Sequence, residues 1–550
     1  MTWKKPLIFS LIGASLLVHG LAVSAAGSVA DPPPPSVKNP LLANYFIEPI
    51  ISKEDQENLA KFDLVILDKE VPHNYPSLLT RLRQKNPRIK ILAYVPVQHV
   101  SSNLKPNNPA TALSYKLKSS LLPNWYLRKS THEIVSVWPN TAMVNMTSGW
   151  QDFLPHFVAF NILKNNEWDG VFYDGIEEKI SWTSRDIDLD SDWAADPSDE
   201  IDWRWKNATV HMLEISRRLF GRKLILANTA NEIYAPYLNG ILYENFANWP
   251  GYLWPENFAR LRQSVRATLA PHLIVVNGTT SDTGYNKDYR RVRYGLVTAL
   301  LADAYFSFDY GPTRHGQTWW YDDYSFDLGQ PSGPVRLVVS ASAGKEDLRQ
   351  DYFTAGMDRH ALYKESAQAE FIAGRVKGQD AIDGYSIKAV SPGRQWNEFL
   401  RSDPRLLPLA KNTGYEVTFK YKILQPSIKG YFYFGTRSDL RPDLGNRQVV
   451  TWNGAAGESG LVTAFITPRA SDYYLYYGIK HDGAVVLDNI SVKKLGTGLW
   501  QRDFARGTVY LNNSSRAMGV GSPAAAVSKL ILAPDDGLIV KQDETARTEN

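Results

Sequence analysis

The sequence predicts an α/β fold in which a (β/α)8 TIM barrel is followed by a jelly-roll-like β-sandwich and a small terminal β-domain. Strand and helix patterns alternate between residues 39 and 330, as they do in a parallel sheet with helical connections. From about Gly378 the helical signals nearly vanish, and short strands with turn signals between them, among them 473–478 and 483–492, are typical of a sandwich. A few further strands between 507 and 540 predict the terminal domain.

The predicted barrel strands are residues 41–47, 62–67, 89–97, 171–173, 224–227, 241–243, 273–276 and 305–308. A capping-box-like start at Ser52 and helical patterns at 76–84, 150–163, 203–220, 256–269 and 289–302 lie between most of them. A doubly wound open sheet is the alternative. It usually carries a Gly-rich phosphate loop after its first strand, where this chain reads Phe46-Ile47-Glu48-Pro49, so the barrel is favoured.

The barrel is organised around the stretch from Trp168 to Ile176. Its β-branched and aromatic residues 171–173 predict a buried strand that ends on Asp174 and a flexible Gly175. A carboxylate at the carboxyl end of a barrel strand is where such folds place their chemistry. The structural alternative is that Asp174 only caps the loop that follows.

Composition narrows the function classes. A hydrophobic fraction of 44% and a charged fraction of 21% are typical of a globular protein, and a net charge of +4 gives no reason to expect nucleic acid as a partner. The absence of cysteine excludes disulfides, thiol nucleophiles and thiolate metal sites. Aromatic residues make up 12% of the chain, which suits stacking on sugars but also a large core.

The N-terminus predicts export. Lys4 and Lys5 precede an apolar stretch from Pro6 to Val23, and small residues follow it, so we expect a signal peptide cleaved after Ala25. An uncleaved anchor is the alternative, because the stretch is nearly long enough to span a bilayer. Residues 26–38 then read as a Pro-rich linker. We expect a secreted or periplasmic protein without stable membrane insertion after cleavage.

Polar side chains recur where the predicted strands end. Asp174 and Glu244 end the fourth and sixth strands, close enough across the barrel mouth to flank one bond, as glycosidic hydrolysis requires. We predict Asp174 as nucleophile, held by Tyr173, Asn145 or Asn228, and Glu244 as acid/base, partly buried beside Phe246 and Trp249. The predicted substrate-binding residues are Asp68, Tyr94, Asn145, Asn228, Asn245, Trp249, Asn277 and Asp309. No metal and no cofactor are expected.

One acidic loop is a separate candidate. The acids at 186, 188, 190 and 192 are spaced as in a calcium loop. That pattern requires Gly at its sixth position and Glu at its twelfth, where this chain has Ser191 and Pro197. A solvated acidic loop is therefore favoured over a calcium site.

The C-terminal half divides into smaller parts. We expect the barrel at 39–330, a β-rich connection at 331–377, the sandwich at 378–495, inserted within or placed before a terminal β-domain at 496–541, and a disordered tail at 542–550. The sandwich aromatics at 431, 433, 452, 474 and 476 could line a sugar-binding face or pack in a core.

An ordered set of motifs carries a resemblance. These are the segments 62–68, 125–128, 144–147, 168–174, 243–246 and 299–309, with 500–507 near the end. Residues 41–311 resemble the glycoside hydrolase-like barrels of the hypothetical glycoside hydrolase family fifteen and, more distantly, endo-α-1,4-polygalactosaminidase-like barrels. Residues 486–492 are similar to the last strand of jelly-roll carbohydrate-binding modules. The resemblance implies a catalytic acid at Asp174 and a second at Glu244, and no particular sugar.

The sequence therefore predicts an exported glycoside hydrolase that cleaves a polysaccharide, such as a bacterial exopolysaccharide, with retention of configuration. A non-catalytic polysaccharide-binding protein on the same barrel is the rival, and a surface adhesin that binds through the sandwich is a third class. Fold alone does not separate them.

Overall fold

The computed structural model describes residues 38–165, 167–229, 232–248, 253–341, 349–351, 360–362, 372–441, 447–520 and 530–542. The predicted signal peptide, nearly all of the linker at 26–38, the tail beyond Gln542 and the predicted site residue Trp249 lie outside these ranges. No helix within the described ranges combines the length and apolar character needed to cross a membrane.

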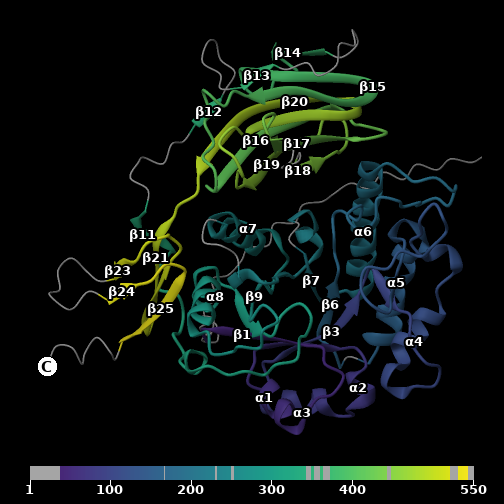
Figure 1. The fold of residues 1–550 in the computed structure, drawn as a ribbon, viewed down its shortest axis with the longest axis vertical. Coiled ribbons are helices and arrows are strands. Elements are labelled where there is room, and N and C mark those ends of the chain that lie inside the picture. Colours follow the sequence, from purple (N-terminus) through teal and green to yellow (C-terminus); the bar gives the residue numbers. More distant parts are fainter. Residues whose placement is uncertain are drawn as a thin grey trace, which may run out of the picture. The chain divides into compact units, whose positions relative to one another are not determined.

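Eight parallel strands close into a barrel, which confirms the predicted fold (Figure 1). Their order around the barrel is β1-β10-β9-β8-β7-β6-β3-β2. Their bounds are β1 Leu41–Phe46, β2 Leu64–Asp68, β3 Lys90–Pro96, β6 Gly170–Asp174, β7 Leu224–Asn228, β8 Gly240–Tyr243, β9 Val275–Thr279 and β10 Tyr305–Asp309. Two further short strands, β4 His99–Ser101 and β5 Thr141–Met143, form a separate pair.

The alternation of side chains along the strands builds two cores. Alternate residues such as Tyr45, Ile66 and Phe172 fill the barrel interior, and their neighbours pack outward against the helices. Gly170 starts β6 where a Cβ would lie 2.0 Å from the Leu224 carbonyl oxygen, so the close approach of β6 and β7 requires glycine there.

Helices surround this barrel (Figure 1). Ser52 caps the first, accepting a hydrogen bond from the backbone N–H of Asp55 at 3.0 Å, as its sequence predicts. The predicted helix at 150–163 is instead α5, Gln151–Phe157, with a π-helical turn at each end, η3 Met146–Trp150 and η4 Val158–Ile162.

The α-helices are α1 Lys53–Leu59, α2 Val71–Asn74, α3 Leu78–Lys85, α4 Ala112–Ser119, α5 Gln151–Phe157, α6 Ser198–Phe220, α7 Trp254–Ala267 and α8 Tyr289–Leu301. Short 3-10 turns are η1 Pro109–Thr111, η2 Pro123–Trp125, η5 Glu232–Tyr237, η6 Phe246–Asn248 and η7 Asp322–Tyr324.

A second, all-antiparallel unit forms the β-sandwich, with its own hydrophobic core around Phe419, Phe434 and Tyr477. Its strands are β12 Arg349–Asp351, β13 His360–Leu362, β14 Ile372–Lys377, β15 Tyr385–Ser402, β16 Tyr415–Gln425, β17 Tyr431–Arg437, β18 Arg447–Trp452, β19 Ser459–Ile466 and β20 Tyr474–Lys494. The strands predicted at 473–478 and 483–492 are one long strand. Its first half pairs with β17 and its second half with β16, and Gly483, at φ +130°, lies between the halves.

The terminal sheet has the order β11-β21-β22-β25, with β11 Arg336–Ser340, β21 Gly498–Phe504, β22 Gly507–Asn512 and β25 Asp536–Lys541. Strands β23 Met518–Val520 and β24 Leu530–Leu532 pair beside it. Because β11 precedes the sandwich and β21 follows it, the sandwich is inserted between two strands of this sheet. The Ala341 N–H donates to the Thr497 carbonyl at 2.8 Å, so the two ends of the insertion meet.

The terminal sheet shares its core with the barrel. Phe504, Val509 and Leu511 belong to the same buried cluster as the outer barrel residues, and Arg502 donates to the Leu300 carbonyl at the end of α8 at 2.8 Å. The sandwich core is a separate cluster. The terminal sheet is therefore part of the barrel's packing, whereas the sandwich is a module that the chain enters and leaves at one point.

Replacing residues 342–496 with a short Gly-rich turn should leave the barrel and terminal sheet folded, because the turn only has to join strands that already pair. Far-UV circular dichroism and a cooperative thermal transition measure this. A remainder without a cooperative transition would contradict the separation of the cores.

Leu511→Ala should lower the free energy of unfolding of the barrel by about 2–5 kcal/mol, because it leaves a cavity in the shared core. The matched control is Leu530→Ala on an exposed side chain of β24, for which a change within about 0.5 kcal/mol is expected. Denaturant unfolding monitored by tryptophan fluorescence compares the two. Equal effects would show that the terminal sheet does not stabilise the barrel.

Candidate active site

Asp174, Asn228 and Glu244 come together at the carboxyl end of the barrel. Asp174 ends β6, Asn228 ends β7, and Glu244 directly follows β8. Because β7 lies between β6 and β8, the Asn228 amide lies between the carboxylates. Its Nδ2 donates to Asp174 Oδ1 at 3.1 Å and to Glu244 Oε2 at 3.0 Å. Since both oxygens contact one nitrogen, they lie at most 6.1 Å apart, the sum of the two distances.

Tyr94 holds the other oxygen of Asp174. Its hydroxyl donates to Asp174 Oδ2 at 2.7 Å from the end of β3, the neighbour of β6 on the other side. Burial, followed by the negative charge of Asp174, raises the pKa of Tyr94 well above its ordinary value. The phenol therefore stays protonated and donates to the carboxylate. Both Asp174 oxygens thus accept a hydrogen bond, from Tyr94 and from Asn228.

Glu244 has a different environment. Burial raises the pKa of Glu244 above its ordinary value, and the charges of Asp174 and Asp309 act in the same direction. His315 and the hydrogen bond from Asn228 oppose this rise without cancelling it. Of the two carboxyl groups, Glu244 is therefore the one with a raised pKa, as a proton donor requires.

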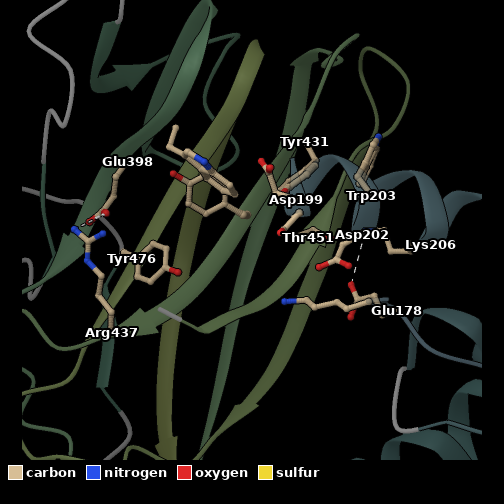
Figure 2. Close-up of a pocket in the computed structure, with 14 residues that line it drawn as sticks. Glu178, Asp199, Asp202, Trp203, Lys206, Glu398, Tyr431, Arg437, Thr451 and Tyr476 are labelled. Atoms are coloured by element: carbon tan, nitrogen blue, oxygen red, sulfur yellow. Dashed lines mark hydrogen bonds and ion pairs between the residues drawn. The ribbon is translucent and has the colours of Figure 1, made fainter. Parts of the chain in front are cut away.

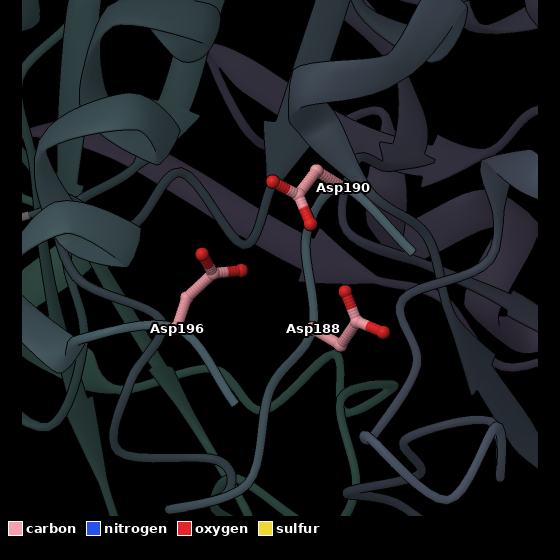
Figure 3. Close-up of side chains that lie close together, drawn as sticks. All are labelled: Asp188, Asp190 and Asp196. Atoms are coloured by element: carbon pink, nitrogen blue, oxygen red, sulfur yellow. The ribbon is translucent and has the colours of Figure 1, made fainter. Parts of the chain in front are cut away.

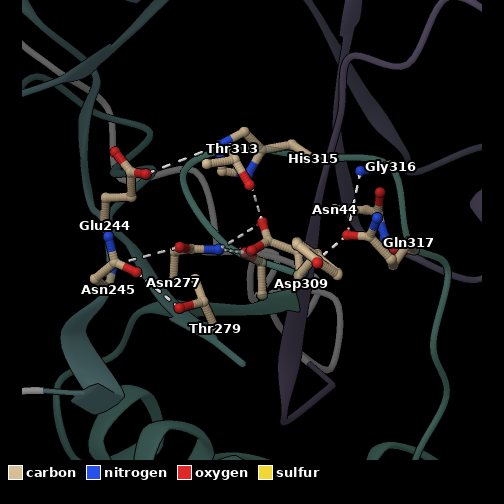
Figure 4. Close-up of polar contacts among 12 residues, drawn as sticks. Asn44, Glu244, Asn245, Asn277, Thr279, Asp309, Thr313, His315, Gly316 and Gln317 are labelled. Carbon is tan, nitrogen blue, oxygen red and sulfur yellow. Dashed lines mark hydrogen bonds and ion pairs between the residues drawn. The ribbon is translucent and has the colours of Figure 1, made fainter. Parts of the chain in front are cut away.

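A buried histidine completes this group. His315, in the loop after β10, bonds through Nδ1 to Asp309 Oδ2 at 2.9 Å, and its Nε2 lies 3.8 Å from Glu244 Oε1 (Figure 4). Burial alone would lower the pKa of His315, but the hydrogen bond and charge of Asp309, with Glu244 and Asp174, outweigh it and the pKa is raised. Its ring also stacks on Tyr45, with centroids 4.1 Å apart.

Asp309 is held in turn by Asn277. The Asn277 amide donates to Asp309 Oδ2 at 3.0 Å and to the Ser307 hydroxyl at 2.8 Å, and all three side chains are buried (Figure 4). Asn277 thus holds Asp309, and Asp309 orients His315, whose other ring nitrogen faces Glu244. The sequence did not identify His315, because one histidine six residues beyond a strand end carries no pattern.

Several predicted site residues have contacts within the protein, and their predicted role in substrate binding stays a prediction. Asn145 donates to the Leu189 carbonyl at 2.9 Å while its oxygen caps the turn at Thr147, so it fixes a loop. Asn245 accepts from the Thr279 hydroxyl at 2.7 Å. Asp68 accepts from the backbone N–H of Glu70 at 2.8 Å. The predicted donor Tyr173 faces outward and bonds to Ser216 of α6 at 3.0 Å, which makes that prediction wrong.

The three acids at 188, 190 and 196 gather in one loop (Figure 3), with carboxylate oxygens within 4.8 Å of one another. Both oxygens of Asp188 accept backbone N–H groups of the loop, from Ser191 at 2.6 Å and from Trp193 at 3.1 Å. Asp196 accepts from the Leu189 N–H at 2.7 Å. Asp188 and Asp196 thus hold the loop by hydrogen bonds to its backbone.

The barrel segment of the chain matches one known family model. Residues 83–347 match the family model described as hypothetical glycosyl hydrolase family 15. No match is found among curated proteins.

Solved structures give weak, partial likenesses. The glycoside hydrolase domain of a PelA variant from Pseudomonas aeruginosa is 13% identical over 49% of this chain and 94% of its own, with a TM-score of 0.34. A CBM22-1 xylan-binding domain from Paenibacillus barcinonensis is 15% identical over 28% and 98%, with a TM-score of 0.23. The CBM22-1–GH10 modules of a Clostridium thermocellum xylanase are 12% identical over 27% and 28%, with a TM-score of 0.22, so this chain spans about a quarter of that protein.

The match over residues 83–347 confirms the resemblance drawn from the sequence: the barrel segment of this chain is similar to the hypothetical glycosyl hydrolase family 15.

Proposed function

We propose that the protein is a glycoside hydrolase that cleaves a polysaccharide with Asp174 and Glu244. The observation that carries the proposal is the shared Asn228 amide, which holds the two carboxylates together at the catalytic end of the barrel. The family match over 83–347 supports the same class of reaction.

The spacing favours retention of configuration. Retaining enzymes hold their carboxyl groups roughly 5–5.5 Å apart, and inverting enzymes need roughly 6.5–9.5 Å to admit a water. The limit of 6.1 Å between Asp174 Oδ1 and Glu244 Oε2 lies below the inverting range. Asp174 then attacks the anomeric carbon while Glu244 gives its proton to the leaving oxygen. Water releases the sugar in the second step, with Glu244 taking the proton of that water.

His315 positions and tunes the acid in this scheme. Its Nδ1 is committed to Asp309, so Nε2 is the nitrogen that faces Glu244. Because His315 lowers the pKa of Glu244 while burial raises it, the two effects together set the pH at which the acid loses its proton.

We further propose that the chain acts outside the cytoplasm, on the strength of its N-terminal segment. Edman sequencing of the exported protein should begin at Ala26. A chain that keeps its first residues in the membrane fraction would instead support an uncleaved anchor.

The purified protein incubated with a panel of bacterial exopolysaccharides should release new reducing ends from at least one of them. Binding without release of reducing ends would support the rival class, a polysaccharide-binding protein on a hydrolase-like barrel. Proton NMR of the first product reports its anomeric configuration and separates retention from inversion.

Glu244→Gln should reduce cleavage of the natural polymer by about 10²–10⁴-fold, because the leaving oxygen loses its proton donor. The first step on aryl glycosides with activated leaving groups should be spared, since these need little protonation. Asp174→Asn should abolish both activities. Stopped-flow release of the aryl group measures the first step, and full activity of Glu244→Gln on the polymer would contradict its role.

His315→Asn should move the basic limb of the kcat/KM pH profile to higher pH. Asparagine retains a donor toward Asp309 but removes the imidazolium that lowers the pKa of Glu244, so the pKa of Glu244 rises and the acid keeps its proton to higher pH. The matched control is His211→Asn, an exposed histidine of α6 bonded to Asp152, which should leave the profile unchanged. A limb that stays in place or moves to lower pH would contradict the coupling.

A further inference from the structure

A cavity of about 390 Å³ lies between helix α6 of the barrel and the sandwich (Figure 2). One wall comes from the barrel, with Trp203 and Lys206 of α6 and Glu178 before it. The other wall comes from β15, β17, β18 and β20 of the sandwich. None of the lining residues belongs to the group around Asp174 and Glu244.

Aromatic rings from both units line this cavity. Trp203 lies against Tyr431, with ring centroids 4.8 Å apart, and Trp396 meets Tyr433 edge-on at 5.1 Å. Tyr476 continues the same surface at 5.9 Å from Tyr433. The three tyrosines are nearly fully buried, whereas 37% of Trp396 is exposed, so the surface runs from the interface out to solvent.

Charged groups of the cavity are paired within it. Lys480 of β20 forms an ion pair with Asp199 of α6, and Arg437 bonds to Glu398 at 3.1 Å. Lys206 donates to the Thr451 hydroxyl across the interface and lies 3.8 Å from Glu178. Burial lowers the pKa of both Lys206 and Lys480 to about 8.

These features differ from those of a simple packing surface. Protein interiors and tight interfaces are filled to near-crystalline density, and a void of this volume is unusual there. Aromatic walls with a few fixed polar groups around several hundred Å³ are characteristic of ligand pockets. Three ion pairs neutralise the charges named above, and the two remaining charged lining residues, Lys179 and Asp202, have opposite signs, so the formal charges around the pocket balance.

We propose that this cavity is a second glycan-binding site, built jointly by the barrel and the sandwich, that takes a segment of a neutral oligosaccharide. The aromatic faces would stack on the apolar faces of the sugar rings, and Thr451, Glu178 and Glu398 would meet their hydroxyls. The site goes beyond the proposed catalytic pair and rests on the proposed function only for the class of ligand. Because Trp203 and Lys206 come from the barrel, the sandwich alone does not form it.

The test is a binding titration on the full chain carrying Glu244→Gln, so that the ligand is not consumed. Tryptophan fluorescence and calorimetry with cello-, malto-, manno- and chitooligosaccharides should show saturable binding to at least one series. Oligogalacturonides, which carry a carboxylate on each ring, should bind more weakly. Trp203→Ala and Trp396→Ala should each weaken binding by about tenfold or more. Trp193→Ala, on an exposed loop tryptophan, is the matched control and should leave affinity unchanged.

Folding is checked by the melting temperature of each variant, and Trp203→Phe provides a gentler change that should keep most of the affinity. Wild-type affinity in both Trp203 variants would overturn the joint site and assign any binding to the sandwich alone. No binding by any neutral series at millimolar concentration, or preferential binding of oligogalacturonides, would overturn the proposal. Glu244→Gln should lose hydrolysis and keep glycan binding. The binding test can therefore fail independently of the test of the proposed function.

Discussion

The Asn228 amide is the interaction on which the candidate active site depends. Two carboxylates side by side in water would repel each other and separate, but one N–H₂ group between Asp174 and Glu244 donates a hydrogen bond to each. The barrel makes this possible because β7 lies between β6 and β8, so Asn228 at its end lies between Asp174, which ends β6, and Glu244, which directly follows β8. Closure of the sheet thus sets the distance on which the proposed chemistry relies.

Around that amide, burial separates the properties of two chemically similar groups. Asp174 accepts hydrogen bonds at both oxygens, whereas Glu244 is desolvated and has a raised pKa. Behind Glu244, the buried series Asn277, Asp309 and His315 fixes which imidazole nitrogen faces the acid. Such a series is costly to bury unless its members are hydrogen-bonded to one another, as Asn277 in β9, Asp309 at the end of β10 and His315 in the loop after β10 are.

The packing of the two hydrophobic cores explains the order of the terminal sheet and the sandwich along the chain. The terminal sheet completes the outer core of the barrel through Val509 and Leu511, so the chain must return to the barrel after leaving it. The sandwich is placed in between, where Ala341 and Thr497 meet, and has a core of its own. It nevertheless contacts α6 through Lys480 and Thr451, and the cavity between α6 and the sandwich lies beside these contacts.

The sequence by itself determined the eight barrel strands, the all-β nature of the later units and the two carboxylates, because strand periodicity and strand-end acids are local signals. Only the tertiary structure decided that Asn228 bridges the pair, that His315 joins it, and that Asn145 and Tyr173 turn to Leu189 and Ser216 instead. It also decided that one long strand, β20, replaces two and that β11 belongs to the terminal sheet. The physical reason is that hydrogen-bond partners and strand pairing depend on groups from different strands and loops, which meet only in the folded chain and which no local pattern records.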